Sequence, residues 1–172
     1  IFVTHDQEEA MTTADRMAVL DQGVLQQVGT AAGLYDEPHN RFVAGFVGTA
    51  NLLEGQVTAL DGDTLVFDAQ GLGRLTLPAP AEPPAPGAAA LALRPHQIRI
   101  AAEGEPGDAS RVWLQGRVEA AEFLGEFSRY RVRVGEVALV ADQPHYAGGA
   151  MFSPGAQVRL GLAPTQLRYL HR

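Results

Sequence analysis

Residues 51–77, which read NLLEGQVTALDGDTLVFDAQGLGRLTL, decide the fold. Short runs rich in Leu, Val and Thr recur within them, at residues 52–60, 64–67 and 74–77. Turn residues such as Asp61-Gly62-Asp63 separate these runs. Runs of this length bounded by Gly and Asp are typical of β-strands. The stretch therefore predicts consecutive strands and marks the start of a mostly β domain.

The same pattern continues toward the C-terminus. Residues 78–87 carry five prolines among alanines, which predicts an extended surface loop that joins two β units. Many short strands with frequent turns indicate a closed barrel or a pair of barrels. Further strands are expected at residues 88–93, 97–100, 112–123, 128–134, 137–141, 157–162 and 167–170.

The chain begins with a different pattern. The apolar run at residues 1–4 predicts a buried strand. Asp6, with Glu9 three residues later, predicts the N-cap of an amphipathic helix through a variant of the capping box. The apolar positions at helical spacing are Ala10, Met11, Ala14, Met17 and Ala18.

A hairpin and two short helices are expected next. Residues 17–20 and 24–29 flank a turn that contains Gly, which favours a β-hairpin. Thr30 and Asn40 are predicted N-caps of two helices, the second of which ends at Gly48.

Composition restricts the classes of protein that remain. The chain has 172 residues, of which 46% are hydrophobic, so it can bury a sizeable core. No apolar run approaches the roughly 20 residues of a membrane-spanning helix. It has no Cys, which fits a reducing compartment, and its net charge of −7 opposes binding to polyanions. Because it begins with Ile rather than Met, we expect it to be cut from a longer protein.

The first ten residues, IFVTHDQEEA, resemble the switch-histidine segment of ABC ATPases, in the branch that powers maltose, polyamine and ferric-iron importers. The likeness continues through residues 14–20, 26–30 and 34–48. The chain departs from the family pattern at Ala31, where Pro is usual, and at Gly33, where a larger residue is common. Both departures lie at the start of one short helix, so they concern that helix rather than the family.

Two later stretches resemble the regulatory domain of the same branch. They are residues 51–55, NLLEG, and residues 91–98, LALRPHQI, in which His96 stands where the family normally has an acid. That domain is an oligonucleotide-binding-like (OB-like) β-barrel often called TOBE. The resemblance implies a mainly β chain in two parts. Residues 1–48 would be the short α/β C-terminal remnant of a RecA-like ATPase domain, and residues 49–172 the OB-like TOBE domain.

The resemblance implies ATP and Mg²⁺ as cofactors of a longer parent ATPase. Hydrolysis in that family needs a Walker A loop, whose backbone and Lys hold the phosphates, and a Walker B acid for the metal ion. The sequence contains no Walker A, signature or Walker B motif, and all thirteen of its basic residues are Arg. We therefore expect this chain alone to bind no cofactor and to have no ATPase activity.

His5 is the one site residue that the resemblance assigns, in catalysis and in ATP binding. It follows an apolar run and precedes a predicted helix N-terminus, where the helix dipole favours an anion. In the intact parent, the resemblance implies that His5 hydrogen-bonds the γ-phosphate and the attacking water. In this chain alone, we expect a turn histidine that bonds only a backbone carbonyl.

Other polar residues have simpler interpretations. Arg129, Arg131 and Arg133 alternate with apolar residues, so they share one face of a strand. A nucleic-acid surface would add exposed aromatics to such a face, whereas Tyr130 points to the opposite side. We expect a solvated or partner-facing stripe. Residues 142–149 are expected to form a loop at a barrel mouth, either a plain turn or a seat for a small ligand.

The remaining histidines show no spacing typical of a zinc site, so no metal site is predicted. These histidines are His39, His96, His145 and His171.

The sequence thus predicts the C-terminal regulatory and dimerising part of the ATP-binding subunit of an ABC importer. Expected partners are a second copy, the membrane subunits of the transporter and a small-molecule or protein regulator, with no nucleic acid. The expected location is cytoplasmic, on the inner face of the plasma membrane.

Two alternatives for its function remain open. One is a solute-sensing domain that binds an oxyanion or metal complex and inhibits import, and the other is a nucleic-acid-binding barrel. The stretch GTANLL at residues 48–53 is closer to polyamine and ferric-iron importers than to sugar importers. Without the rest of their sheet, residues 1–4 are expected to be disordered, rearranged or exchanged between chains.

Overall fold

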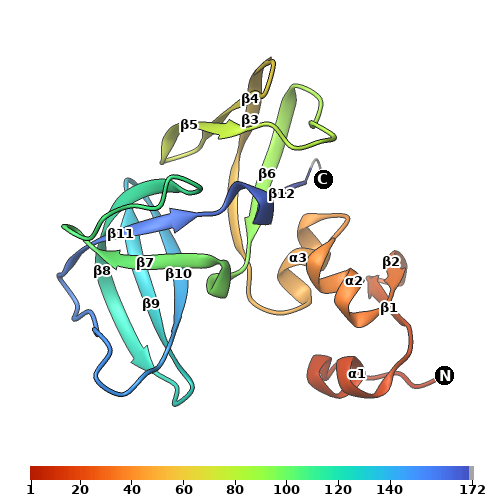
Figure 1. Ribbon diagram of the computed structural model, residues 1–172. Helices are drawn as coiled ribbons and strands as arrows, with labels where there is room; N and C mark the ends of the chain where they lie inside the picture. Colours follow the sequence, from red (N-terminus) through yellow and green to blue (C-terminus); the bar gives the residue numbers. More distant parts are fainter. Residues whose placement is uncertain (171–172) are drawn as a thin grey trace.

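A computed structural model of the protein describes residues 1–170. The described residues contain two five-stranded sheets, one two-stranded hairpin and three short α-helices. The hairpin and the helices come first in the chain and lie together beside the sheets (Figure 1). The mainly β class predicted from the sequence is confirmed. The N-terminal elements are α1 (Gln7–Thr13), β1 (Met17–Asp21), β2 (Val24–Gly29), α2 (Ala31–Asp36) and α3 (Arg41–Phe46).

The elements that follow α3 are all strands and two 3₁₀ turns. They are β3 (Asn51–Asp61), β4 (Thr64–Ala69), β5 (Gly73–Pro78), β6 (Gly87–Leu93), η1 (Pro95–Gln97), β7 (Ile98–Ala102), β8 (Val112–Phe123), β9 (Phe127–Val134), β10 (Val137–Pro144), β11 (Gln157–Leu162), η2 (Pro164–Gln166) and β12 (Arg168–Leu170).

The first large sheet has the strand order β12-β6-β3-β4-β5, and all its neighbours are antiparallel. The Pro-rich loop joins β5 to β6 within this sheet, because β6 returns to pair with β3 from Asn51↔Leu93 to Val57↔Gly87. The prediction that this loop separates two β units is therefore wrong. Turn composition marks where strands end, but it does not indicate which strands pair.

The second large sheet is curled, with the order β10-β9-β8-β11-β7. Its edge strands β7 and β10 approach each other, but no ladder joins them within residues 1–170. The expected closed barrel is therefore a half-barrel with an open seam, as the lower left of Figure 1 shows.

One apolar core lies between the two sheets. Phe67 and Leu91 come from the first sheet, Tyr130 and Leu160 from the second, and each is 0% exposed. Burial of a large apolar side chain contributes about 1.5–3 kcal/mol, so this core is the main source of stability. Asn51 also joins the sheets, because its side-chain amide donates to Val140 O at 2.9 Å and accepts from Val140 N at 2.7 Å.

The N-terminal segment, residues 1–48, has a small core of its own, made by Val19, Leu34, Val43 and Val47. The predicted hairpin is confirmed, and Gln22 and Gly23 at its turn have positive φ. The three predicted N-caps are confirmed as well. The side chains of Asp6, Thr30 and Asn40 accept from Glu9 N, Gly33 N and Val43 N.

Two predictions for the start of the chain are wrong. Residues 1–4 form no strand, and the side chain of Phe2 is 66% exposed, because the apolar run finds no neighbouring strand among residues 1–170. Helix α1 ends at Thr13, and Met17 and Ala18 lie in β1 instead. The hairpin strand predicted at residues 17–20 already included these two residues, so the helical pattern was extended too far along the chain.

The N-terminal segment contacts the first sheet through small side chains. Ala44 of α3 packs against Ala90 and Ala92 of β6 and Leu170 of β12. Small residues allow the helix to come close to the strand, so the polar groups at the end of α3 lie within reach of the loop that follows β6. None of the helices among the described residues has the length and apolar character needed to span a membrane.

Candidate functional site: the His5 turn and the Arg94 junction

A closed set of hydrogen bonds shapes the turn that carries His5. Asp6 N donates to Thr4 Oγ1 at 3.0 Å, and this hydroxyl donates to Glu9 Oε2 at 3.1 Å. Glu9 N donates to Asp6 Oδ1 at 3.0 Å. The predicted capping box is therefore relayed through Thr4, since Glu9 does not bond the N-cap amide directly. Residues 4–9 thus hold the backbone on both sides of His5.

The His5 side chain itself is exposed. Within residues 1–170 it makes no side-chain hydrogen bond, so the bond to a backbone carbonyl expected for this chain is not found. The γ-phosphate role that the resemblance assigns to His5 stays a prediction.

Arg94 forms a junction between the N-terminal segment and the sheets. It follows β6 and is only 4% exposed. Among residues 1–170, its guanidinium donates to four backbone carbonyls and to no carboxylate. These acceptors are Tyr35 O at 2.8 Å, Ala44 O at 2.8 Å, Gly48 O at 3.2 Å and Thr49 O at 3.3 Å.

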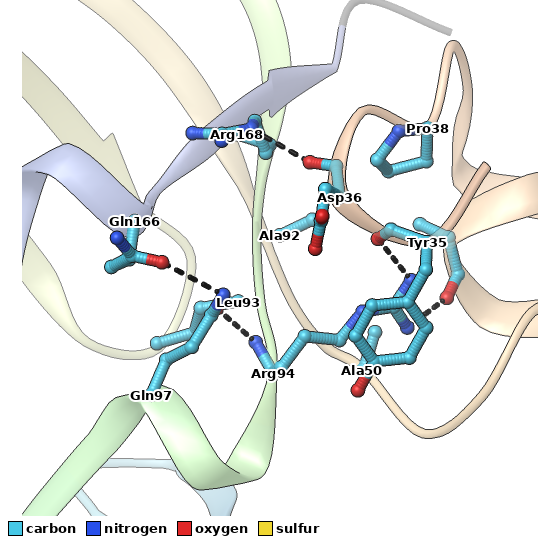
Figure 2. A pocket seen from close by; sticks show the side chains of 11 residues that line it. Tyr35, Asp36, Pro38, Ala50, Ala92, Leu93, Arg94, Gln97, Gln166 and Arg168 are labelled. Atoms are coloured by element: carbon cyan, nitrogen blue, oxygen red, sulfur yellow. Dashed lines mark hydrogen bonds between the residues drawn. The ribbon is translucent and has the colours of Figure 1, made fainter. Parts of the chain in front are cut away.

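The acceptors of Arg94 lie near the C-termini of α2 and α3, where carbonyl groups lack partners within the helix. These helix ends also carry partial negative charge, which favours a cation. The guanidinium stacks on the Tyr35 ring, 4.0 Å from its centroid, as Figure 2 shows. Burial lowers the pKa of Arg94 below its ordinary value. An Arg starts from so high a value that it stays charged.

Gly48 makes the close approach at the junction possible. Its φ is +80°, and a Cβ at this position would lie 2.9 Å from Tyr35 Cε2. Any other residue would therefore strain the backbone and push Tyr35 away from Arg94. Gly48 N also donates to Gln7 Oε1 at 3.0 Å, which brings helix α1 to the same place.

The junction is packed too tightly to hold a ligand. About 10 Å³ of free volume remains among its lining residues, which is no more than a single water needs. Around it, Gln97 Nε2 donates to Gln166 Oε1 at 3.1 Å and Arg168 Nε donates to Asp36 O at 2.8 Å (Figure 2). We therefore interpret the Arg94 junction as a structural connection between the N-terminal segment and the sheets, and not as a ligand site.

A separate cavity of about 340 Å³ lies at the seam between β7 and β10. Ile98 and Ile100 give it apolar walls, while Arg99 and Arg111 bring positive charge. Arg99 Nη2 is paired with Glu105 Oε1 at 2.6 Å. The nearest ion pair of Arg111, with Asp108 Oδ2, is longer, at 3.7 Å. Arg111 is thus the less neutralised of the two cations.

Carboxylates neutralise the predicted arginine stripe on β9. Arg129 forms a bidentate ion pair with Asp142, and both hydrogen bonds measure 2.8 Å. Arg131 and Arg133 both pair with Glu119, at 3.2 and 2.8 Å. The Arg133 hydrogen bond holds the pKa of the Glu119 carboxyl below its usual value. The stripe is therefore a set of cross-strand ion pairs.

The structure spreads the other candidates apart. His96 stacks on Tyr35 with ring centroids 6.2 Å apart, and His145 meets the edge of Phe123 at 4.9 Å. His171 lies outside the described residues. Within residues 1–170, no group of three potential metal ligands is found. The loop expected at residues 142–149 begins later, because residues 142–144 belong to strand β10, and Ala150 and Phe152 beyond its predicted end line the 340 Å³ cavity.

Sequence reasoning missed the role of Arg94. The residue lies in one of the stretches that carried the family resemblance, but its partners are carbonyl groups 45 to 59 residues away. Every residue has a backbone carbonyl, so the sequence does not indicate which of them an Arg side chain will bond. The available signal was an Arg directly after a strand whose five final residues are all buried, Ala89–Leu93.

Comparison with known proteins defines the class of domain first. Residues 91–170 match the family model of the TOBE domain. This match begins within β6, just before Arg94, and extends to the end of β12. The chain therefore carries a TOBE domain.

The wider relatives are ATP-binding subunits of importers. The chain is 40% identical over 161 residues to the spermidine/putrescine import ATP-binding protein PotA of Rubrobacter xylanophilus, covering 92% of this chain and 41% of the relative. It is 36% identical to PotA 1 of Pseudomonas aeruginosa, covering 95% of this chain and 43% of the relative. The chain is thus similar to the ATP-binding proteins of these importers, and it spans about two fifths of the length of these relatives.

Solved structures with a similar fold include a molybdate-binding protein. The cytoplasmic molybdate-binding protein ModG, with molybdate bound, superposes with a TM-score of 0.59 over 71% of this chain and 96% of that chain. The sequence identity is 14%, so the likeness concerns the architecture alone. It agrees with the OB-like half-barrel found here.

Proposed function

We propose that this chain is the C-terminal regulatory part of an importer ATP-binding subunit. In it, residues 1–48, which we call the His5 segment, and the TOBE domain move as one unit. The Arg94 junction carries this proposal. A buried guanidinium of the TOBE domain holds the carbonyl ends of both α2 and α3. Leaving such groups unpaired costs about 1–3 kcal/mol each, so the two parts separate only at a large cost.

In the parent protein, His5 contacts the γ-phosphate of ATP, and other parts of the subunit hold the phosphates and Mg²⁺. Closing of that site displaces residues 1–48, and the junction passes the displacement to the TOBE domain. This chain alone does not turn over ATP. The absence of Lys from all 172 residues supports this, because the phosphate loop of such ATPases needs one. We keep the boundary between the two parts at residues 48–49.

The TOBE domain pairs with that of a second subunit, and the assembly sits on the inner face of the plasma membrane with its membrane subunits. The tip formed by the 123–126 and 145–151 loops offers an apolar surface for pairing. Phe123, Leu124, Tyr146 and Met151 are each about half or more exposed there, at 48 to 71%. Light scattering tests the pairing, and a monomer at high micromolar concentration would contradict it.

The transported solute is a polyamine. The relatives that support this are named for spermidine and putrescine import. The experiment is uptake of labelled spermidine in cells that lack their own polyamine importer and express the parent gene with its membrane subunits. Arg94→Met should abolish most uptake at an unchanged amount of subunit. Arg94→Lys should keep part of it, because an ammonium group can still donate to carbonyl groups.

Arg168→Met is the matched control. Arg168 also donates to the end of α2, through Asp36 O, but it is less buried than Arg94 and makes none of the four Arg94 hydrogen bonds. Its replacement should leave uptake unchanged. Uptake that is equal in the Arg94→Met and Arg168→Met variants would contradict the proposed role of the junction.

A second candidate function is solute sensing, in which the domain binds an oxyanion or metal complex and inhibits import. The 340 Å³ cavity favours it, because Arg111 lies there with only a weak ion pair. ModG, which shares the fold, is described as a molybdate-binding protein. Titration calorimetry with molybdate and sulfate tests this function. Saturable heat that Arg111→Gln removes would support it, and no heat would exclude these anions.

The nucleic-acid alternative comes last. The three arginines that suggested it are paired with Asp142 and Glu119, so the stripe carries little free positive charge. A salt-dependent shift of a labelled oligonucleotide would reverse this ranking.

A further inference from the structure

Helix α1, which follows His5, is fastened to the rest of the molecule by few contacts. None of its seven residues is buried, and Met11 touches the small core of the N-terminal segment only partly. The long-range polar contact of the helix is the hydrogen bond from Gly48 N to Gln7 Oε1, at 3.0 Å, between residues 41 positions apart. Gln7 is therefore the point where the His5 segment meets the Arg94 junction.

The Gly48 residue bonds in two directions at once. Its N–H donates to Gln7, and its carbonyl oxygen accepts from Arg94 Nη1 at 3.2 Å. Its N–H also contacts Phe46 O at 3.1 Å. The two groups lie on either side of the Gly48 Cα, so a displacement of this residue changes the geometry of both hydrogen bonds. Gly48 cannot move freely either, because Tyr35 lies against it.

The series continues into the TOBE domain. Arg94 N donates to Gln97 Oε1 at 2.8 Å, and Gln97 Nε2 donates to Gln166 Oε1 at 3.1 Å. Gln166 belongs to η2, directly before strand β12. The polar groups of Gln7, Gly48, Arg94, Gln97 and Gln166 thus form one connected path, which we call the Gln7 relay.

We infer that Gln7 is a positioning residue: it couples the placement of the His5 turn to the TOBE domain through the Gln7 relay. When Gln7 bonds Gly48, the first turn of α1 is fixed against the junction, and His5 is held only two residues away. When that bond opens, α1 loses its hydrogen bond to the junction, while Met11 still packs partly against the small core of the N-terminal segment. The use of this coupling in import rests on the proposed function, whereas the coupling itself is a property of this chain.

The experiment is NMR on the isotopically labelled chain with three variants of Gln7. Gln7→Met keeps the length of the side chain but removes the acceptor, so the Gly48 amide should exchange about fivefold faster, as the loss of a net hydrogen bond of about 1 kcal/mol predicts. Gln7→Glu keeps an acceptor oxygen and should retain the protection. Gln7→Lys offers only donors and should behave like Gln7→Met.

A double-mutant cycle separates coupling from simple packing. Arg94→Lys should shift the amide signals of residues 5–13, which Arg94 does not touch. In the Gln7→Met background the same Arg94→Lys change should leave those signals in place. Arg168→Lys, outside the relay, is the control and should not shift them in either background. Shifts at residues 5–13 that are the same in both backgrounds, or an unchanged Gly48 exchange rate in Gln7→Met, would refute the inference.

A second experiment measures solute uptake by the parent importer and tests whether import uses the Gln7 relay. If the unmodified parent imports labelled spermidine, Gln7→Met should lower the solute moved per ATP hydrolysed, and Gln7→Glu should restore it. Equal stoichiometry in both variants would show that import does not use the relay. If the unmodified parent imports no polyamine, the proposed solute is wrong, and the NMR cycle still decides whether the relay exists.

Discussion

The two parts of the molecule are held together by different forces. The sheets enclose a continuous apolar core with fully buried side chains such as Phe67, Leu91 and Tyr130. The N-terminal segment, residues 1–48, has a core of four buried apolar side chains and relies on caps and hydrogen bonds to carbonyl groups for the rest of its stability. Apolar burial is the dominant favourable term in folding, so the sheets can stand alone more easily than the segment.

This difference shows why the junction matters. Helices of six or seven residues are unstable by themselves in water, so α1, α2 and α3 depend on tertiary contacts. Arg94 and the small residues of β6 supply such contacts to α2 and α3. Because the stability of these helices depends on contacts from outside the segment, a change at the Arg94 junction should alter them. This dependence suits a regulatory connection.

The largest expected effect comes from the core of the sheets. Phe67→Ala removes a side chain that is 0% exposed and should lower the free energy of unfolding by about 3–5 kcal/mol. Urea denaturation followed by circular dichroism measures it. Leu34→Ala, equally buried in the small core, should instead speed amide exchange within residues 1–48 and leave the sheets intact. If Leu34→Ala destabilised the sheets as much as Phe67→Ala, the contrast between the two parts would be lost.

A substitution at Gly48 tests the Arg94 junction more specifically. Gly48→Ala places a Cβ 2.9 Å from the Tyr35 ring at a φ of +80°, and this should cost about 1–3 kcal/mol. Limited proteolysis should then cut residues 1–47 faster. Gly45→Ala is the matched control, because a Cβ there meets nothing within 4 Å and Gly45 lies in α3, where Ala is the better helix former. Equal cleavage rates in the two variants would count against the strained approach of Gly48.

Asn51 tests how firmly the two sheets are joined. Asn51→Leu leaves both the N–H and the carbonyl of Val140 without their partners, at a cost of about 1–3 kcal/mol. Amide exchange at Val140 should accelerate. Asn51→Asp keeps the acceptor for Val140 N, so it should preserve more of that protection. Slow exchange at Val140 in the Leu variant would show that packing alone fixes strand β10.

The smallest expected effect depends on pH. Burial raises the pKa of Tyr169 in β12 to about 12, whereas an unfolded Tyr titrates at about 10. The folded state therefore favours the neutral phenol. Its contribution to stability is complete below pH 10 and is lost as the pH rises from about 10 through about 12. Tyr169→Phe should remove this part of the alkaline loss of Tm, and identical slopes in both proteins would argue against burial of the phenol.

Much of the fold could be predicted from local patterns. The strand at residues 112–123 has the predicted bounds, and the N-caps at Asp6, Thr30 and Asn40 form as expected. In these cases the determining interactions lie within a few residues of one another. The strand expected at residues 1–4 failed because a buried strand needs neighbours, and the apolar pattern does not guarantee that they are present.

The candidate site was harder to predict for a related reason. His5 was found through a family resemblance, and nothing in the structure tests its role. The polar partners of Arg94 are backbone carbonyl groups, which every residue has, so composition could not indicate them. The pairing of Arg131 and Arg133 with Glu119 likewise depends on the register of β8 and β9. Long-range register is the information that turn and strand signals do not contain.

The most direct test of the account is hydrogen exchange of Arg94→Met, compared with the unmodified chain and with Arg168→Met. We predict that Arg94→Met speeds exchange throughout α1, α2 and α3 while the core strands of the TOBE domain stay protected, and that Arg168→Met changes little. If the three helices keep their protection without the Arg94 guanidinium, the junction does not join the His5 segment to the TOBE domain, and the proposed regulatory connection is contradicted.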